Sequence, residues 1–346
     1  MTVKLLKELC ETAAIPGREQ LLIDVMNREL KKSSDKVSVD GMGNVIGYKK
    51  GTGKTRKKVM IAGHMDEIGF IVTNIDKNGF IRFLPRGGHI PKVLISQRVK
   101  IMSKNPVTGV VEGPPTFISD DKDARRKSAD FKDLFIDTGL SAAVVKKSIE
   151  VGDFIVLDRG FIQQGDNYIS KAFDNRVGCY IVLETMKRLK KHQVDVYGVG
   201  TAQEEVGIRG ATNASRDIAP DIGIALDVTA AFDTPGVEEH KQVTKLGAGA
   251  AIKINDSYSI SNHGIVKYLK TLAKKHKIPY QMEVLPFGGT DAQGMQMFGS
   301  GPVCTISIPT RYVHSPNEMI NKKDLEAAIQ LLVKFIESCE KCKLEF

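Results

Sequence analysis

The stretch VMIAGHMDEIG, residues 59–69, decides the fold class of this chain. It opens with four apolar residues, Val59 to Ala62, and such a short continuous run is typical of a strand buried on both faces. His64 and Asp66 follow two positions apart, so in extended backbone both side chains leave the same face. One of them can bind a metal ion while the other orients it. The stretch therefore predicts a buried strand with a candidate functional site at its carboxyl end.

Helical and strand patterns alternate after this stretch, beyond about residue 165. We expect helices over 177–191, 265–275 and 325–336, the last with Asn321 as N-cap, and strands over 194–202, 222–226, 281–285 and 303–308. Before it, the pattern predicts a helix over 22–30 and a strand pair over 36–48. Alternation of this kind predicts an α/β fold with a layered sheet.

Between residues 69 and 164 the pattern changes to short β-like runs broken by Gly and Pro. These runs predict a small inserted β-barrel-like domain. The chain then divides into a first segment of the main domain (1–68), the insert (69–164) and a second segment of the main domain (165–346).

Composition and charge exclude several classes of protein. The 346 residues include 50 basic and 41 acidic side chains, a net charge of +9, but the basic ones are scattered and there is no Trp, so we expect no nucleic-acid partner. No window approaches the roughly 18 apolar residues of a spanning helix, and Glu8 and Glu11 interrupt the start where a signal peptide is apolar. Five sparse cysteines suit a reducing cytoplasm, and we assign no chemistry to the C-x-x-C of Cys339 and Cys342.

Three more acidic residues follow predicted strands. Glu204 and Glu205 come directly after the strand over 194–202, and adjacent carboxylates repel unless a cation lies between them. One of the two can bind metal while its neighbour reaches a metal-bound water. Asp227 closes the strand over 222–226, where a carboxylate needs a cation or a cap as its partner.

Asp174 and His314 complete the candidate set. Asp174 precedes a predicted helix, and taken alone it is more typical of a helix N-cap. His314 lies on the loop after the strand over 303–308, where function is often placed. Only it and His64 have such a setting, and we expect the other histidines at the surface: His89, His192, His240, His263 and His276.

Together these residues offer two imidazoles, three carboxylates and one further glutamate. This set suits two divalent cations that share a bridging carboxylate, about 3.5 to 4 Å apart. The nitrogen ligands favour zinc, with cobalt or manganese as alternatives. Two cations lower the pKa of a bridging water and polarise a carbonyl, so the set predicts a hydrolase.

Six motifs in order along the chain resemble family forty-two of the metallopeptidases, the tetrahedral or glutamyl aminopeptidases. These belong to the larger group of di-zinc exopeptidases, and the resemblance spans nearly the whole chain. The motifs are Gly63-His64-Met65-Asp66-Glu67-Ile68-Gly69, Ala172-Phe173-Asp174-Asn175-Arg176, Gln203-Glu204-Glu205-Val206-Gly207, Leu226-Asp227, Gly288-Gly289-Thr290-Asp291-Ala292 and Arg311-Tyr312-Val313-His314-Ser315.

The resemblance implies a mixed sheet flanked by helices and a role for each site residue. His64, Asp174 and Asp227 would hold one metal, and Asp174, Glu205 and His314 the other. Glu204 would be the general base with Asp66 behind His64, and Gly288, Gly289 and Thr290 would line the substrate site. The substrate would be a peptide with a free N-terminus. The insert would build subunit contacts, and dimers would assemble into a hollow tetrahedral dodecamer.

Two other functions remain open at this point. Related hydrolases with similar two-metal ligands are carboxypeptidases or N-deacylases, and a carboxypeptidase needs a cation for the substrate carboxylate, which Arg176 or Arg311 could supply. A metal-dependent binding scaffold is the non-enzymatic alternative. Glu204 speaks against the scaffold, because such a site needs no base beside its ligands.

Overall fold

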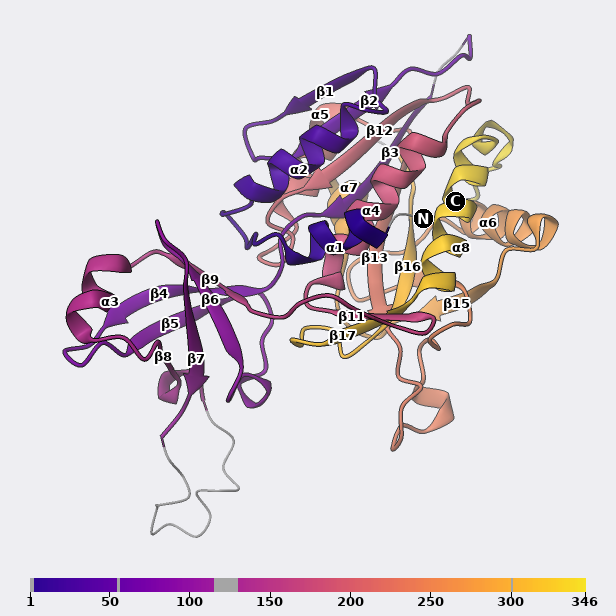
Figure 1. Ribbon diagram of the computed structural model, residues 1–346. Coiled ribbons are helices and arrows are strands. Elements are labelled where there is room, and N and C mark those ends of the chain that lie inside the picture. The colour runs from indigo at the N-terminus through magenta and orange to yellow at the C-terminus, as the bar shows by residue number, and fades with distance from the viewer. Residues whose placement is uncertain (1–2, 55–56, 115–129, 300) are drawn as a thin grey trace.

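The computed structural model describes residues 3–54, 57–114, 130–299 and 301–346 of the chain. A large mixed sheet forms the main body of the molecule (Figure 1). Its strands are β1 (Lys36–Val39), β2 (Val45–Lys49), β3 (Lys58–His64), β10 (Ile162–Gln164), β11 (Asn167–Ser170), β12 (Asp195–Thr201), β13 (Ile222–Ala230), β14 (Ala250–Asn255), β15 (Tyr280–Val284), β16 (Val303–Arg311) and β17 (Glu318–Asn321). They lie in the order β1-β2-β12-β3-β13-β16-β17-β11-β10, and β14 pairs with β16 and β15.

Four adjacent strands, β12, β3, β13 and β16, run parallel to one another. Thr201 at the end of β12 lies opposite His64 at the end of β3, and Asp227 in β13 lies opposite Ser307 in β16. The carboxyl ends of the four strands therefore meet at one edge of the sheet, where open α/β sheets bind their ligands.

Helices cover both faces of the sheet. One face carries α1 (Val3–Glu11), α2 (Gln20–Leu30), α4 (Phe173–Arg188), α6 (His263–His276) and α8 (Lys322–Ile336), and the other carries α5 (Arg209–Ile218) and α7 (Asp291–Phe298). Val59 and Ile61 of β3 belong to the first core, whereas Met60 and Ala62 pack with α5 and α7 in the second. The continuous apolar run of β3 is thus explained by burial on both faces.

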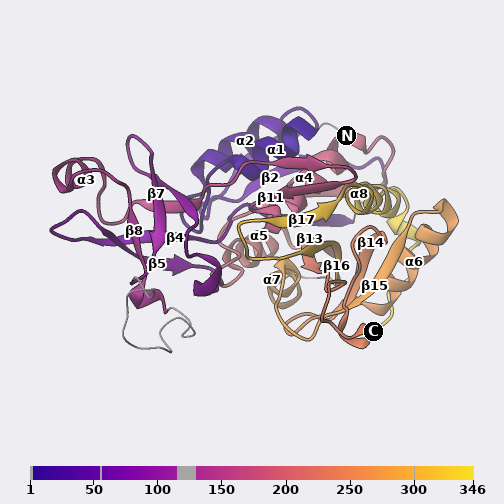
Figure 2. The same ribbon diagram turned by 60° about the horizontal axis from the view of Figure 1, so that its bottom comes forward.

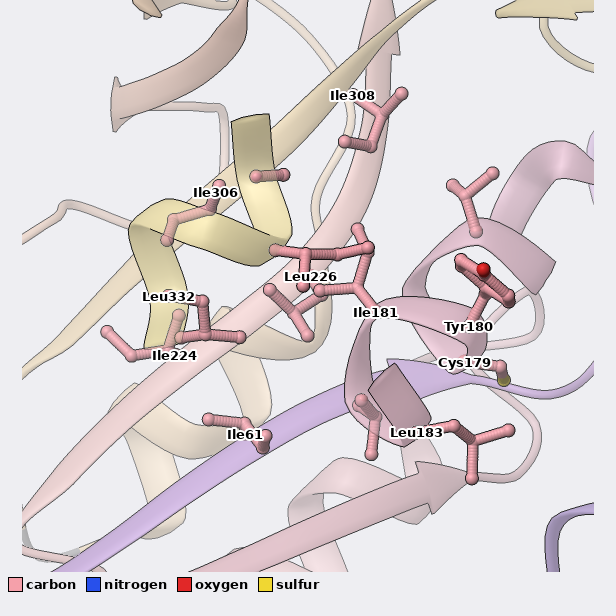
Figure 3. Close-up of a cluster of buried hydrophobic side chains, with 14 of the residues drawn as sticks. Ile61, Cys179, Tyr180, Ile181, Leu183, Ile224, Leu226, Ile306, Ile308 and Leu332 are labelled. Atoms are coloured by element: carbon pink, nitrogen blue, oxygen red, sulfur yellow. The ribbon is translucent and has the colours of Figure 1, made fainter. Parts of the chain in front are cut away.

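The first core lies between the parallel strands and helices α4 and α8. Figure 3 shows Ile61, Leu226 and Ile306 from three neighbouring strands gathered with Ile181 of α4 and Leu332 of α8. All five side chains are buried. This packing fixes α4 against the sheet and with it the residues at the start of α4, which belong to the candidate site.

The insert is a closed barrel with its own core. Its strands are β4 (Gly69–Ile75), β5 (Ile81–Arg86), β6 (Arg98–Met102), β7 (Val107–Glu112), β8 (Phe135–Asp137) and β9 (Phe154–Leu157), in the order β4-β5-β8-β7-β6-β9. Short helices accompany them: η1 (Pro91–Val93), η3 (Phe131–Asp133) and α3 (Ala142–Ser148). Figures 1 and 2 show the barrel to one side of the main body. The predicted α/β fold with an inserted barrel is confirmed.

The exact division of the chain into domains stays a proposal. The barrel begins at Gly69 and its last strand ends at Leu157. Strand β10 already pairs with β11 in the main sheet, although the sequence pattern assigned residues up to 164 to the insert.

Two further observations concern the chain as a whole. Within the described ranges, no helix is both long and apolar enough to cross a membrane. All five cysteines are buried free thiols. Cys339 at the start of η5 (Cys339–Lys341) and Cys342 after it point to different carbonyls, those of Ile336 and Gly264.

Candidate metal centre

The predicted site residues meet at the carboxyl edge of the four parallel strands. His64 ends β3, Asp227 lies in β13, Glu204 and Glu205 follow β12, and His314 follows β16. The parallel register of β12, β3, β13 and β16 brings these strand ends together. All of them line one cavity of about 1170 Å³, together with Asp174.

Asp174 lies between the two imidazoles. Its Oδ1 is 3.1 Å from His64 Nε2 and its Oδ2 is 3.2 Å from His314 Nε2. Although Asp174 falls within the bounds of α4, its φ of −76° and ψ of 104° are not helical. Asp174 therefore does not cap the helix: the regular turns of α4 begin after Asn175, whose side-chain oxygen accepts a hydrogen bond from the Gly178 N–H at 2.9 Å.

The His64 ring is oriented by the chain just after it. Its Nδ1 lies 2.9 Å from the main-chain carbonyl of Asp66, and a carbonyl only accepts, so Nδ1 carries the proton. Nε2 then faces Asp174, Glu204 Oε2 (3.8 Å) and Asp227 Oδ1 (3.9 Å), and it is the nitrogen that can release its proton and bind a metal ion. This tautomer is the one a metal-binding imidazole requires.

The carboxylate of Asp66 has a different contact from the expected one. It accepts hydrogen bonds from the main-chain N–H groups of Glu204 and Glu205, both at 3.0 Å, while its Oδ1 lies 3.7 Å from His64 Nδ1. Asp66 thus fixes the turn that carries both glutamates, and its main-chain carbonyl rather than its carboxylate orients His64.

Carboxylates crowd this edge of the sheet. Burial raises the pKa of Glu204 and of Asp227 well above the usual range, and the neighbouring carboxylates raise both further. Burial also opposes charge on Asp174, but hydrogen bonds from His314 and His64 hold its pKa below the usual value. A group of buried carboxylates is stable in its charged form only beside positive charge, which bound cations would supply.

The geometry fits divalent metal ions. Ligand atoms of His64, Asp174 and Glu205 lie within 4.8 Å of one another, as do those of His64, Glu204 and Asp227. Glu205 Oε1 is buried without a hydrogen bond of good geometry, although His314 Nε2 lies 3.3 Å away. Imidazole and carboxylate donors of this kind are those that zinc and related ions bind in proteins.

Glu318 supports two of these residues and was missed in the sequence. Its carboxylate is buried and accepts from the Asp174 N–H at 3.0 Å and from the His314 N–H at 2.9 Å. Burial, with Asp174 nearby, raises its pKa to about 8. No local pattern around Glu318 distinguishes it from an ordinary residue at a strand start.

Apolar side chains make up most of the remaining cavity wall, among them Ile208, Val237, Leu285 and Phe287. Gly288 and Gly289 line it as expected. Thr290 does not: it is buried as the N-cap of α7, where its hydroxyl accepts from the Ala292 N–H at 3.2 Å. Thr290 therefore positions the start of α7 behind the two glycines.

The two arginines considered as carboxylate anchors are already paired. Arg176 is fully buried and donates to the carbonyls of Leu9, Thr12 and Ala14 and to Glu67. Arg311 forms two hydrogen bonds with Asp233, at 2.9 and 2.8 Å.

Lys253 is the one ammonium or guanidinium group among the described residues that line the cavity. It lies 3.2 Å from both Asp256 and Glu283, which are buried with it. Its positive charge is thus already balanced by two carboxylates. None of these three cations is therefore free to fix a substrate carboxylate.

Two of the five histidines expected at the surface are buried in part or in full. His192 is buried and contacts the Val194 carbonyl at 2.8 Å. His89 lines the cavity and contacts the Gly69 carbonyl through Nε2 at 3.0 Å. The expectation was wrong for these two, because turns and neighbouring lysines in the sequence do not show which loops fold inward. His240, His263 and His276 are exposed.

Comparison with known proteins places this chain in a family. The family model described as M42 glutamyl aminopeptidase matches residues 43–331. A putative aminopeptidase of Acetivibrio thermocellus is 42% identical over 334 residues, which are 96% of this chain and 97% of that protein.

Two solved structures extend the comparison. An aminopeptidase of the archaeon Desulfurococcus kamchatkensis superposes with a TM-score of 0.92 at 40% identity, over 97% of this chain and 94% of that one. The TET1 peptidase of Pyrococcus horikoshii, which assembles into a tetrahedron or a large octahedral shell, has a TM-score of 0.87 at 28% identity, over 98% and 100% of the two chains. The chain therefore belongs to the M42 glutamyl aminopeptidase family and is a peptide hydrolase.

Proposed function

We propose that this enzyme removes single residues from the free amino termini of peptides with the help of two divalent cations. The observation that carries the proposal is Asp174, whose two oxygens lie beside the two imidazoles His64 and His314. One carboxylate in this position can serve two cations, and a site with a shared ligand is typical of hydrolases with paired metals.

The ligands divide into two sets that share Asp174. His64, Asp174 and Asp227 would hold one cation, and Asp174, Glu205 and His314 the other. We propose zinc, with cobalt or manganese as alternatives, because nitrogen and carboxylate donors occur together. When bound, two such cations lower the pKa of water and polarise the carbonyl of the scissile bond.

Glu204 would act as the general base. Its side chain faces the cavity, and its Oε2 lies 3.8 Å from His64 Nε2, farther than the 3.1 Å of Asp174 Oδ1. Asp66 holds the Glu204 main chain through its N–H. In this position Glu204 can take a proton from the attacking water and later give it to the leaving amine.

Two observations favour an aminopeptidase over a carboxypeptidase. The relatives found by the comparison are aminopeptidases. The basic side chains that could bind a substrate carboxylate, those of Arg176, Arg311 and Lys253, already have partners within the chain. A free α-amine, in contrast, needs carboxylates and metal, which this edge of the sheet offers.

The test compares matched peptides that differ only in an N-acetyl group. We expect the wild-type chain to release the first residue from the free peptide and to leave the acetylated peptide intact, with product analysis by mass spectrometry. Activity should disappear on chelation and return with zinc, cobalt or manganese. Equal cleavage of both peptides would favour the deacylase alternative, and full activity in a metal-free chain would contradict the proposal.

We further propose a hollow tetrahedral dodecamer built from dimers, located in the cytoplasm. The assembly is supported by the likeness to the TET1 peptidase of Pyrococcus horikoshii and by the inserted barrel beside the main body. Five buried free thiols support a reducing compartment.

A further inference from the structure

A loop of the inserted barrel packs directly on a proposed metal ligand. The loop follows β5 and precedes η1, and its residues Gly88 and His89 line the same cavity as the ligands. A Cβ atom placed on Gly88 would lie 3.0 Å from Nδ1 and 3.2 Å from Cε1 of His314. A methyl group on residue 88 would therefore crowd this imidazole ring, and one of the two would have to shift by a few tenths of an ångström.

The preceding residue, Gly87, contacts a second ligand of the same set. A Cβ atom there would lie 3.0 Å from Glu205 Oε2 and 2.6 Å from Ile68 Cγ2, and the φ of Gly87 is +83°. Two consecutive glycines thus cover His314 and Glu205, two of the three residues proposed for the second cation.

His89 fixes this loop to the barrel. Its Nε2 donates a hydrogen bond to the Gly69 carbonyl at 3.0 Å, and its ring stacks on Phe70 with centroids 4.2 Å apart. Burial lowers the pKa of His89 to about 4, so the ring is neutral. The loop is therefore held by β4, the strand that follows the His64 segment.

The main chain of His314 is also fixed. Its φ of 61° lies in the left-handed region, and its N–H donates to Glu318 at 2.9 Å. If the loop and the main chain of His314 both stay in place, a methyl group on residue 88 must displace the imidazole ring. Such a displacement is a few tenths of an ångström, comparable with the window of about 0.2 Å in which metal–ligand distances fall.

We propose that Gly88 is a positioning residue for the second cation: the barrel loop holds the His314 imidazole where it can bind metal. The inserted barrel is then part of the support of the metal centre, although it supplies no ligand. This inference rests on the ligand sets of the proposed function and adds a residue that lies outside them.

The test is Gly88→Ala in the full-length chain, with Gly113→Ala as the matched control. Neither glycine has a φ in the left-handed region, so alanine suits both backbones, and among the described residues a Cβ on Gly113 meets Leu134 alone, at 3.6 Å. We would equilibrate each protein with zinc just sufficient to fill the wild type and measure zinc per subunit. Gly88→Ala should keep one zinc and bind the second about 10–100-fold more weakly, with activity restored by excess zinc, and Gly113→Ala should keep two.

A second variant and a stability measurement complete the design. His89→Phe keeps the stacking on Phe70 but loses the hydrogen bond to Gly69, so we expect a smaller weakening of the same zinc. The melting temperature of Gly88→Ala without metal should equal that of the wild type. A lowered melting temperature with loss of both zinc ions would overturn the proposal, because it would indicate general damage.

The outcomes also separate this inference from the proposed function. A wild-type chain with fewer than two zinc ions would contradict the proposed function. Two zinc ions of unchanged affinity in the wild type, Gly88→Ala and His89→Phe would overturn only the role of the barrel loop.

Discussion

Glu204 and Glu205 are neighbours in the chain but face different partners. The Asp66 carboxylate accepts hydrogen bonds from the main-chain N–H groups of both glutamates, whose side chains then point to different imidazoles. Glu205 Oε1 lies 3.3 Å from His314 Nε2, whereas Glu204 Oε2 lies 3.8 Å from His64 Nε2. One turn thus provides both a ligand and a base, each beside a different imidazole.

This divergence gives a prediction for Glu204→Gln. The variant should retain both cations, because Glu204 is not in the proposed ligand sets, but lose turnover by about 10²–10⁴-fold, because an amide cannot accept the proton of water. Elemental analysis and steady-state kinetics on a free-amino peptide measure the two effects. Wild-type turnover in Glu204→Gln would remove this residue from the mechanism.

Asp174→Asn should behave differently. An amide has one acceptor oxygen where the carboxylate has two, so it cannot serve both sets of ligands. We expect the variant to bind both cations weakly, with metal per subunit falling below that of Glu204→Gln under the same dialysis. Normal metal content would show that Asp174 does not bridge the two sets.

Glu318→Gln tests whether the hydrogen bonds of Glu318 hold the proposed metal ligands in place. The carboxylate accepts from the N–H groups of Asp174 and His314 with its two oxygens, and glutamine can replace only one of them. The remaining N–H is buried without an acceptor, so we expect metal affinity to fall by about 10–100-fold while the ligands stay intact. Isothermal titration with zinc measures the change, and unaltered affinity would contradict the role of Glu318.

A site residue could be predicted from the sequence when the strand before it has a clear apolar pattern. His64 and Asp227 follow apolar runs, so their place at the sheet edge could be predicted. Asp174 alone resembled a helix cap, because only tertiary structure brings it between two imidazoles. Glu318 and His89 depend on contacts with distant segments, which no local pattern records.

At the scale of secondary structure, α4 links the metal centre to the N-terminal helices. Arg176, two residues after Asp174, is fully buried and donates to the carbonyls of Leu9, Thr12 and Ala14 at 2.5, 2.7 and 3.1 Å. It also lies 3.1 Å from Glu67, which pairs with the buried Lys171. This network joins α1, the end of β3 and the start of α4.

Arg176→Met should therefore destabilise the fold. Removal of the guanidinium leaves three carbonyls without this donor and a buried carboxylate with one partner fewer. Because loss of one partner from a buried ion pair is strongly destabilising, we expect the free energy of unfolding to fall by about 3–5 kcal/mol. Urea denaturation followed by circular dichroism measures the free energy of unfolding. In the exposed control Arg28→Met, which loses contacts with Glu8 and Glu29, we expect about 1 kcal/mol or less.

Long amphipathic helices were predictable, and short ones were not. The helices expected over 265–275 and 325–336 agree with α6 and α8 within three residues, and the side chain of Asn321 does accept from the Lys323 N–H. Helices α5 and α7 were missed, because each is short and contains Gly, which is a poor helix former. Packing on β3 and β13 stabilises them despite this composition.

At the scale of the whole molecule, the barrel exposes many apolar side chains. Leu84, Ile90, Leu140, Val144 and Val151 are each more than one-third exposed. Exposed apolar side chains that form a contiguous patch are typical of a surface that contacts another subunit. The alternation of short strands predicted the barrel, but the exposure of these apolar side chains became visible only in the structure.

We expect the particle mass from light scattering to be that of twelve subunits. If the particle is hollow, it should trim extended peptides and leave a folded protein of the same chain length intact, because only an extended chain can enter the interior. The digestion products of both substrates can be compared in one assay. A mass of one subunit would contradict the assembly and leave the chemistry unaffected.

The proposed ligands are spread along the chain from His64 to His314. A nascent chain leaving the ribosome exposes His64 early, yet the second set lacks His314 until most of the sequence has been translated. Strand β16 must also pair with β13 before His314 can reach Asp174, and pairings between distant segments form late in folding. If His314 binds metal as proposed, a chain whose synthesis stops before this residue should be inactive, and hydrolysis should begin only when translation is nearly complete.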